Sequence, residues 1–351
     1  MFWLGEKRGN LSDWTTQQWV RATGRRLELK DNLWLDGPVG GTRLIGKQFF
    51  ADYAAKHRFV LIEAGCRGLT PDFSALEEDN PQIASVAQPV REFYERTSEF
   101  DLDVWSQWHG FFRPFGKALS VIFSRRLQQL NVPLSPLDTS KGMTSSVLEM
   151  RDCESGRFAH AAWVRELLAT GNVIYAGSYS ICRIPGHPSP CVKVVFPLPN
   201  GNAIVIMKAE AGTDGALSLR SMGNGFGEPG FYFTVHEGNG IVRARYVGSM
   251  REEIRVYAAE PGTVRTDHTL WIWGAEFLRL HYRMRKAGPR TNCRQCPDWP
   301  DVANRAENAS AFFHGKPPIV MKLTSGLIDS GLTSIRSCVA GPSKWTISSG
   351  G

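Results

Sequence analysis

The pattern of hydrophobic and polar positions is clearest between about residues 172 and 284. Short apolar or alternating runs there are separated by turn dipeptides, which are Pro185-Gly186, Asn200-Gly201, Asp214-Gly215, Asn239-Gly240 and Pro261-Gly262. Asn-Gly and Asp-Gly between alternating hydrophobic residues are strong signals for β-hairpins. About eight strands in about 110 residues leave no room for crossover helices, so the strands must run antiparallel. We therefore expect an α+β chain with a meander that closes into a barrel-like or strongly curved sheet.

The region before this sheet has mainly helical patterning. The run KQFFADYAAKHRFV (47–60) has the spacing of an amphipathic helix. Residues 81 to about 131 also carry apolar residues at helical spacing, including a basic amphipathic helix at 115–130. The segment AHAAWVRELLATG (159–171) fits either a helix closed by its final glycine or the first strand of the sheet.

These patterns divide the chain into three parts. We expect a mixed, mainly helical N-terminal region at 1–137 and an antiparallel β-barrel-like domain at 138–287. An irregular C-terminal tail follows at 288–351, where Ser, Gly, Pro and Asn are frequent and periodicity is poor.

Composition narrows the class of protein without identifying it. The 351 residues are 42% hydrophobic and 21% charged, which is typical of a globular chain. The net charge of +7 comes from scattered basic residues rather than one stripe, so nucleic acid is not expected as a partner. An odd number of cysteines (seven), the absence of a long apolar run and a charged N-terminal start favour a cytoplasmic location.

Familiar motifs are either missing or lack their structural context. The usual G-x-S-x-G, H-E-x-x-H and Walker A patterns do not occur. The string GFGEPG at 225–230 matches G-x-G-x-x-G. A dinucleotide site needs a helix after this motif, but here the motif contains Pro229 and a strand-like run follows it. A bend between strands is therefore favoured over a dinucleotide site. Cys293-x-x-Cys296 has no second pair at zinc spacing, and Cys182 and Cys191 are interpreted as buried free thiols.

A pair of acidic residues is the one sequence feature that suggests a metal. Asp101-Leu-Asp103 has oxygen donors suited to calcium, but it lacks the glycine and glutamate of an EF-hand loop. The N-terminal cap of a following helix explains the pair more economically. We therefore predict no cofactor. If the chain does bind a divalent cation, this pattern favours calcium.

The last strands carry the most promising chemistry. His268 would act as a general base, with Asp267 as the carboxylate, Arg245 stabilising a developing oxyanion and His281 nearby. Neighbouring residues on a strand face opposite sides, so Asp267 reaches His268 only if a bulge intervenes. The candidate ligand-binding residues are Lys193, Tyr246, Trp271 and Trp273. The structural alternative is a histidine at a strand end among surface arginines.

Several stretches resemble a family of uncharacterised bacterial conserved hypothetical proteins. They are DLDVWSQW, FSRRLQQLNVPLSPLDTS, PCVKVVFPLPNGNA and DHTLWIWGAEFLRLHYRM, within about residues 71–284. The resemblance implies a bacterial, cytoplasmic protein and carries over no activity and no catalytic residue.

The sequence is compatible with three functions. The first is a non-classical hydrolase of a small amphipathic ester or lactone, for example an acyl-homoserine lactone, held in a barrel pocket. The second is a lipocalin-like carrier of a lipid or hydrophobic metabolite in the same pocket. The third is a peripheral protein whose basic helix at 115–130 makes weak contact with a membrane surface.

Overall fold

The computed structural model describes residues 3–5, 8–41, 45–63, 65–109, 143–168, 171 and 173–287. The helix expected at 115–130, the Cys293-x-x-Cys296 pair and the tail from 288 lie outside these residues.

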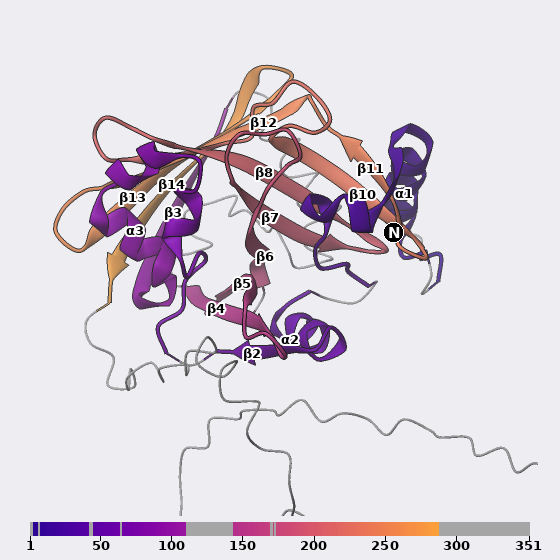
Figure 1. Ribbon diagram of the computed structural model, residues 1–351, viewed down its shortest axis with the longest axis horizontal. Coiled ribbons are helices and arrows are strands. Elements are labelled where there is room, and N and C mark those ends of the chain that lie inside the picture. The colour runs from indigo at the N-terminus through magenta and orange to yellow at the C-terminus, as the bar shows by residue number, and fades with distance from the viewer. Residues whose placement is uncertain are drawn as a thin grey trace, which may run out of the picture.

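The described residues build an antiparallel sheet of 14 strands with three α-helices around it (Figure 1). The helices are α1 (Leu11–Thr23), α2 (Lys47–Lys56) and α3 (Gln88–Glu95). The strands are β1 (Arg25–Glu28), β2 (Phe59–Ile62), β3 (Phe100–Trp108), β4 (Met143–Asp152), β5 (Phe158–Leu167), β6 (Val173–Cys182), β7 (Cys191–Leu198), β8 (Gly201–Ala211), β9 (Leu217–Arg220), β10 (Gly230–Gly238), β11 (Ile241–Tyr246), β12 (Met250–Ala258), β13 (Thr263–Ile272) and β14 (Ala275–Lys286). The first 137 residues thus supply three strands of the same sheet.

The predicted antiparallel meander is confirmed, and its turns fall at the expected dipeptides. Asn200-Gly201 joins β7 to β8, and Asn239-Gly240 joins β10 to β11. Asn239 and Gly240 have φ angles of 50° and 74°, as a type I′ hairpin requires. The glycine-rich string at 225–230 is a bend that leads from β9 into β10.

The sheet divides at β8. Residues Gly201 to Ile206 of this strand pair with β10, whereas Lys208 to Ala211 pair with β9. One branch continues through β10 and β11 to β1, and the other continues through β9, β12, β13 and β14 to β3. On its other side β8 pairs with β7, and the sheet runs on through β6, β5 and β4 to β2.

The sheet curves strongly without closing. The guanidinium carbon of Arg165 on β5 lies 5.4 Å from the ring centroid of Tyr282 on β14, although six strands stand between β5 and β14 in the pairing order. Among the described strands, β2 and β3 end that order and are not paired with each other. The structure is therefore an open curved sheet, and the closed barrel that the pattern also allowed is not confirmed.

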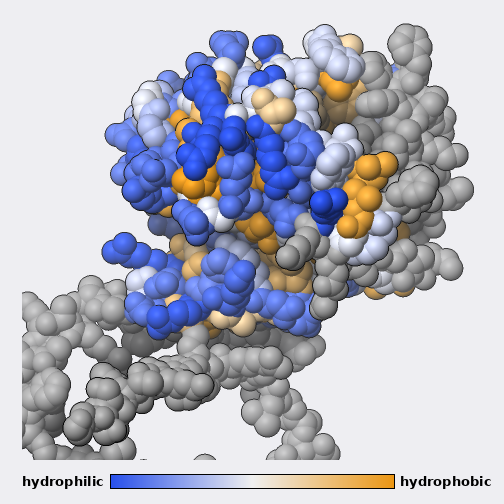
Figure 2. Space-filling model, turned by 90° about the vertical axis from the view of Figure 1, so that its right-hand side faces the viewer, coloured by the Kyte–Doolittle hydropathy of each residue, from blue (hydrophilic) through white to orange (hydrophobic). Residues whose placement is uncertain are grey.

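Different segments cover the two faces of the sheet. One face packs against residues 69–100, where Phe73, Val90 and Phe93 are buried. The opposite face packs against Trp34 and against Phe50 of α2. The side of the molecule that carries α1 is mainly hydrophilic, with separated apolar patches (Figure 2). No helix in the described part of the chain is long and apolar enough to cross a bilayer.

One helix prediction needs correction. Phe100–Trp108, assigned to a helical stretch, is strand β3, and its buried residues Phe100 and Val104 alternate with polar Asp101 and Asp103. A spacing of two is the period of a strand, and this signal outweighs the helical pattern that surrounds it. Asp103 therefore caps no helix, and it accepts a hydrogen bond from Arg283 of β14 at 2.9 Å.

The ambiguous segment at 159–171 belongs to the sheet. Residues Phe158–Leu167 form β5, which pairs with β4 and β6, so the helical alternative is wrong. Trp163 and Arg165 thereby come to lie on the same face of the sheet, two residues apart.

Candidate functional site

A cavity of about 270 Å³ lies between the curved sheet and the segment that covers it. Most of its lining is apolar and comes from strands β5 to β10 and β12 to β14, together with β3 and α3. The apolar side chains that line it include Leu69, Phe93, Val194, Met207, Leu219, Phe231, Ile254, Val256, Leu280 and Met284. A concave, mainly apolar space with a few polar groups is the usual composition of a small-molecule site.

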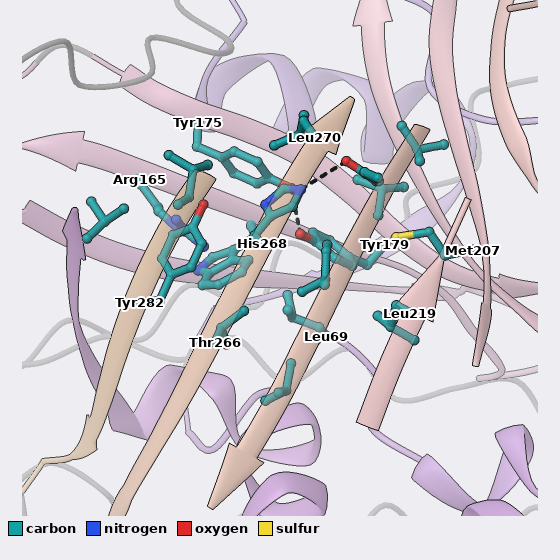
Figure 3. A pocket seen from close by; sticks show the side chains of 18 of the residues that line it. Leu69, Arg165, Tyr175, Tyr179, Met207, Leu219, Thr266, His268, Leu270 and Tyr282 are labelled. Carbon is teal, nitrogen blue, oxygen red and sulfur yellow. Dashed lines mark hydrogen bonds and ion pairs between the residues drawn. The ribbon is translucent and has the colours of Figure 1, made fainter. Parts of the chain in front are cut away.

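A histidine and a glutamate form the first polar group of the cavity, and Figure 3 shows the histidine, His268, among the lining residues. His268 of β13 and Glu252 of β12 lie diagonally across neighbouring strands, because Glu252 stands opposite Leu270 in the register. The imidazole Nε2 lies 3.0 Å from a carboxylate oxygen of Glu252, and the two side chains are 15% and 8% exposed. A carboxylate buried this far needs a hydrogen-bond donor, and His268 supplies it.

A buried arginine surrounded by aromatic rings forms the second polar group. The guanidinium carbon of Arg165 lies 3.5 Å from the ring centroid of Trp163, 4.9 Å from that of Tyr175 and 5.4 Å from that of Tyr282. Arg165 is only 6% exposed, and its Nε has no hydrogen-bond partner among the described residues. Cation–π contacts of this kind are strongest where water is excluded.

Three tyrosines connect these groups. The hydroxyls of Tyr175 and Tyr179 lie 2.5 Å apart, and the ring of Tyr282 stacks on His268 with centroids 6.5 Å apart. Burial raises the pKa of Tyr175, Tyr179 and Tyr282 above the ordinary value. All three hydroxyls therefore stay protonated near neutral pH and can donate hydrogen bonds.

Of the sequence-predicted site residues, His268 is the one that lines the cavity. Asp267 faces the other side of β13, where its carboxylate lies 2.7 Å from Nδ1 of His281, and both side chains are partly exposed. The alternation of side chains along a strand separates Asp267 from His268. The carboxylate that pairs with His268 is therefore that of Glu252 and not that of Asp267.

The remaining predicted residues lie elsewhere. Arg245 is on the shorter branch, where it donates to the backbone oxygen of Thr23. Tyr246, on the same strand, donates to the backbone oxygen of Gly223. Lys193 is buried on the opposite face of the sheet and donates to the backbone oxygen of Asp36 at 2.7 Å.

Neither predicted tryptophan reaches the cavity. Trp271 is not among its lining residues, and Trp273 is 78% exposed in the turn between β13 and β14. No cluster of three or more His, Cys, Asp or Glu side chains in the described ranges is arranged to hold a metal ion.

Two cavity residues that the sequence analysis missed had usable signals. Glu252 and Glu253 are adjacent in an alternating strand, so one of the two must point inward. Arg165 was hidden because its segment was not assigned firmly to a strand. Reading β5 as a strand would have placed Arg165 on the same face as Trp163.

The fold and the cavity define this chain as a β-rich protein with a small internal pocket. It is similar to the uncharacterized membrane protein YndJ of Bacillus subtilis (strain 168), with 26% identity over 248 residues. That region is 70% of this chain and 42% of YndJ, so the chain spans less than half the length of that relative. No protein-family model matches the chain. No solved structure matches it significantly. The similarity agrees with the resemblance to an uncharacterised bacterial family.

Proposed function

We propose that this protein binds a small amphipathic molecule inside its curved sheet. The observation that carries this proposal is the cavity, which is apolar except for Arg165, the Glu252–His268 pair and the tyrosines beside them. An apolar tail would contact the strand residues, and a polar head would meet the charged groups. The cavity of about 270 Å³ suits a small ligand, since drug-sized pockets begin at about 300 Å³.

The similarity to a protein named as a membrane protein supports a ligand that comes from lipid. We propose that this chain works in the cytoplasm next to a membrane, where such molecules partition. A pocket in a curved sheet that carries a lipid or hydrophobic metabolite fits this role.

Filling the cavity tests the proposal. Leu219 lines the cavity and is 1% exposed, so Leu219→Trp places a bulkier indole ring in the cavity. We expect it to weaken binding of the neutral fluorescent probe N-phenyl-1-naphthylamine by about tenfold or more, because the probe and the indole compete for one volume. Fluorescence titration measures this loss.

The matched control is Leu168→Trp, the same exchange at a leucine that is 62% exposed. It should leave probe binding within about twofold of the wild type, since Leu168 is exposed and does not line the cavity. Equal binding by wild type and Leu219→Trp, with both folded by circular dichroism, would contradict the proposal.

A second candidate function is hydrolysis of a small ester or lactone, and the Glu252–His268 pair favours it. His268 would take a proton from water while the water oxygen adds to the substrate carbonyl. It would then return that proton to the departing alkoxide, so the protein is unchanged after the reaction. Glu252 would hold the imidazole in orientation, as the third group of a triad does.

His268→Ala distinguishes the two functions. If the protein is a hydrolase, the exchange should lower turnover of p-nitrophenyl butyrate or hexanoyl-homoserine lactone at least about tenfold. Because the exchange also removes the hydrogen-bond donor of Glu252, turnover is measured well below the melting temperature of the variant, which circular dichroism gives. His281→Ala is the matched control, because His281 also pairs with a carboxylate on this sheet but does not line the cavity. Unchanged turnover in His268→Ala would remove this residue from the mechanism.

A further inference from the structure

Arg165 carries a charge that no carboxylate of the described residues balances at close range. It is 6% exposed, it lines the cavity, and it makes no ion pair with an Asp or Glu of the described chain. Its Nε is buried without a hydrogen-bond partner. An arginine buried in this way is costly to the protein unless another group completes its hydrogen bonds.

Aromatic side chains surround Arg165, and one of them takes up part of its hydrogen-bonding capacity. Aromatic rings from β5, β6 and β14 lie around the guanidinium, and Trp163 is held in place because its Nε1 donates to Ser145 Oγ at 2.8 Å. A guanidinium has five N–H donors. Arg165 hydrogen-bonds to the hydroxyl of Tyr282, and its Nε has no partner among the described residues, so donors remain for an acceptor. Figure 3 shows Arg165 beside Tyr282 at the cavity.

We propose that the ligand of this cavity is a monoanionic amphiphile whose carboxylate binds Arg165 and whose alkyl chain fills the apolar remainder. This inference rests on the proposed binding function and names the class of its ligand. The planar fork of an arginine matches the two oxygens of a carboxylate. A medium-chain fatty acid has this chemistry.

The charges in the cavity favour one negative charge over two. Arg165 contributes one positive charge, and Glu252 already places a carboxylate in the same cavity, held by His268. A phosphate monoester would bring nearly two negative charges near neutral pH, and the second would be repelled by Glu252. A carboxylate needs a single cation, which Arg165 supplies.

Calorimetric titration of the whole chain with decanoate, decanol and decyl phosphate tests this assignment. The three probes share one alkyl chain and differ in the charge of the head. Wild-type protein should bind decanoate about tenfold or more tightly than decanol, in line with a charge-assisted bidentate contact, and more tightly than decyl phosphate. Arg165→Met should abolish the preference for decanoate and leave the affinity for decanol within about threefold, because a methionine keeps the apolar wall.

Two further variants make the outcome unambiguous. Arg165→Lys keeps the charge but loses the fork, so it should retain part of the preference for decanoate. Arg279→Met removes an arginine that does not line the cavity and should leave all three affinities unchanged. Equal binding of decanoate and decanol by wild type would overturn the anion assignment while leaving the binding function intact. Tighter binding of decyl phosphate would overturn the carboxylate, and failure of all three probes would overturn the binding function itself.

Discussion

Gly201→Ala should destabilise the protein by at least about 3 kcal/mol in the free energy of unfolding, since the new atom has no space. A Cβ at Gly201 would lie 1.9 Å from the backbone oxygen of Thr234 and 3.2 Å from Cα of Val235. These are backbone atoms of β10, which pairs with β8 at this point, so no side-chain rotation relieves the contact. The two strands would have to separate at the start of the shorter branch. Urea unfolding followed by circular dichroism measures the loss.

Gly225→Ala is the matched control for this exchange. A Cβ at Gly225 meets nothing within 4 Å, and Gly225 is not among the glycines with positive φ. The same Gly→Ala change should therefore shift the free energy of unfolding by no more than about 1 kcal/mol. If Gly201→Ala were as stable as this control, the pairing of β8 with β10 at Gly201 would be wrong.

Replacing His160 with phenylalanine should make the protein markedly more resistant to acid. His160 on β5 packs against Tyr53 and Phe59, with ring centroids 6.2 Å and 5.9 Å away. Burial lowers the pKa of His160 to about 3, and the charge of nearby Lys193 acts in the same direction. Its Nδ1 is buried and has no hydrogen-bond partner in the described part of the chain. The folded protein therefore holds this imidazole neutral.

The direction of the pH dependence follows from proton binding. Between about pH 6.5 and pH 3 the unfolded chain binds a proton at His160 that the folded chain does not bind. The contribution of His160 to stability is complete above about pH 6.5 and is lost as the pH falls, by up to about 1.4 kcal/mol per pH unit. His160→Phe should remove that slope from urea unfolding curves measured between about pH 6 and pH 4.

Tyr53→Phe controls for changes in packing around this imidazole. It removes a hydroxyl from the neighbouring ring and leaves His160 in place, so it should keep the wild-type slope. Parallel pH profiles for wild type and His160→Phe would mean that the imidazole is protonated in the folded protein.

The hairpins of the central sheet could be predicted because their signals are local. Asn239-Gly240 needs only its own backbone conformation to define a turn, and the runs on either side need only their alternation. The helix at 47–60 was recognised for the same reason, although it ends at Lys56 and gives way to β2. The assignment of Phe100–Trp108 failed because helical neighbours masked a nine-residue alternation.

The site was harder to predict than the fold because its residues meet only through the curvature of the sheet. The inward direction of His268 follows from alternation on β13, but its partner Glu252 depends on the register between β12 and β13. Arg165 approaches Tyr282 only because strands far apart in the pairing order come face to face. Neither the register nor the curvature can be calculated from spacing in the sequence, so Asp267 was chosen on proximity along the chain.

The meeting of β5 with β14 also has a consequence for folding. The walls of the cavity come from strands that are far apart in the pairing order, from β5 to β3, so the cavity is complete only after these distant segments have associated. Contacts of such long range form late and slowly compared with hairpins. A ligand that contacts both walls binds the native fold and does not bind partly folded states in which the walls have not yet met. It would then stabilise the native state by mass action, and occupancy of the cavity would act as a checkpoint for correct assembly of the chain.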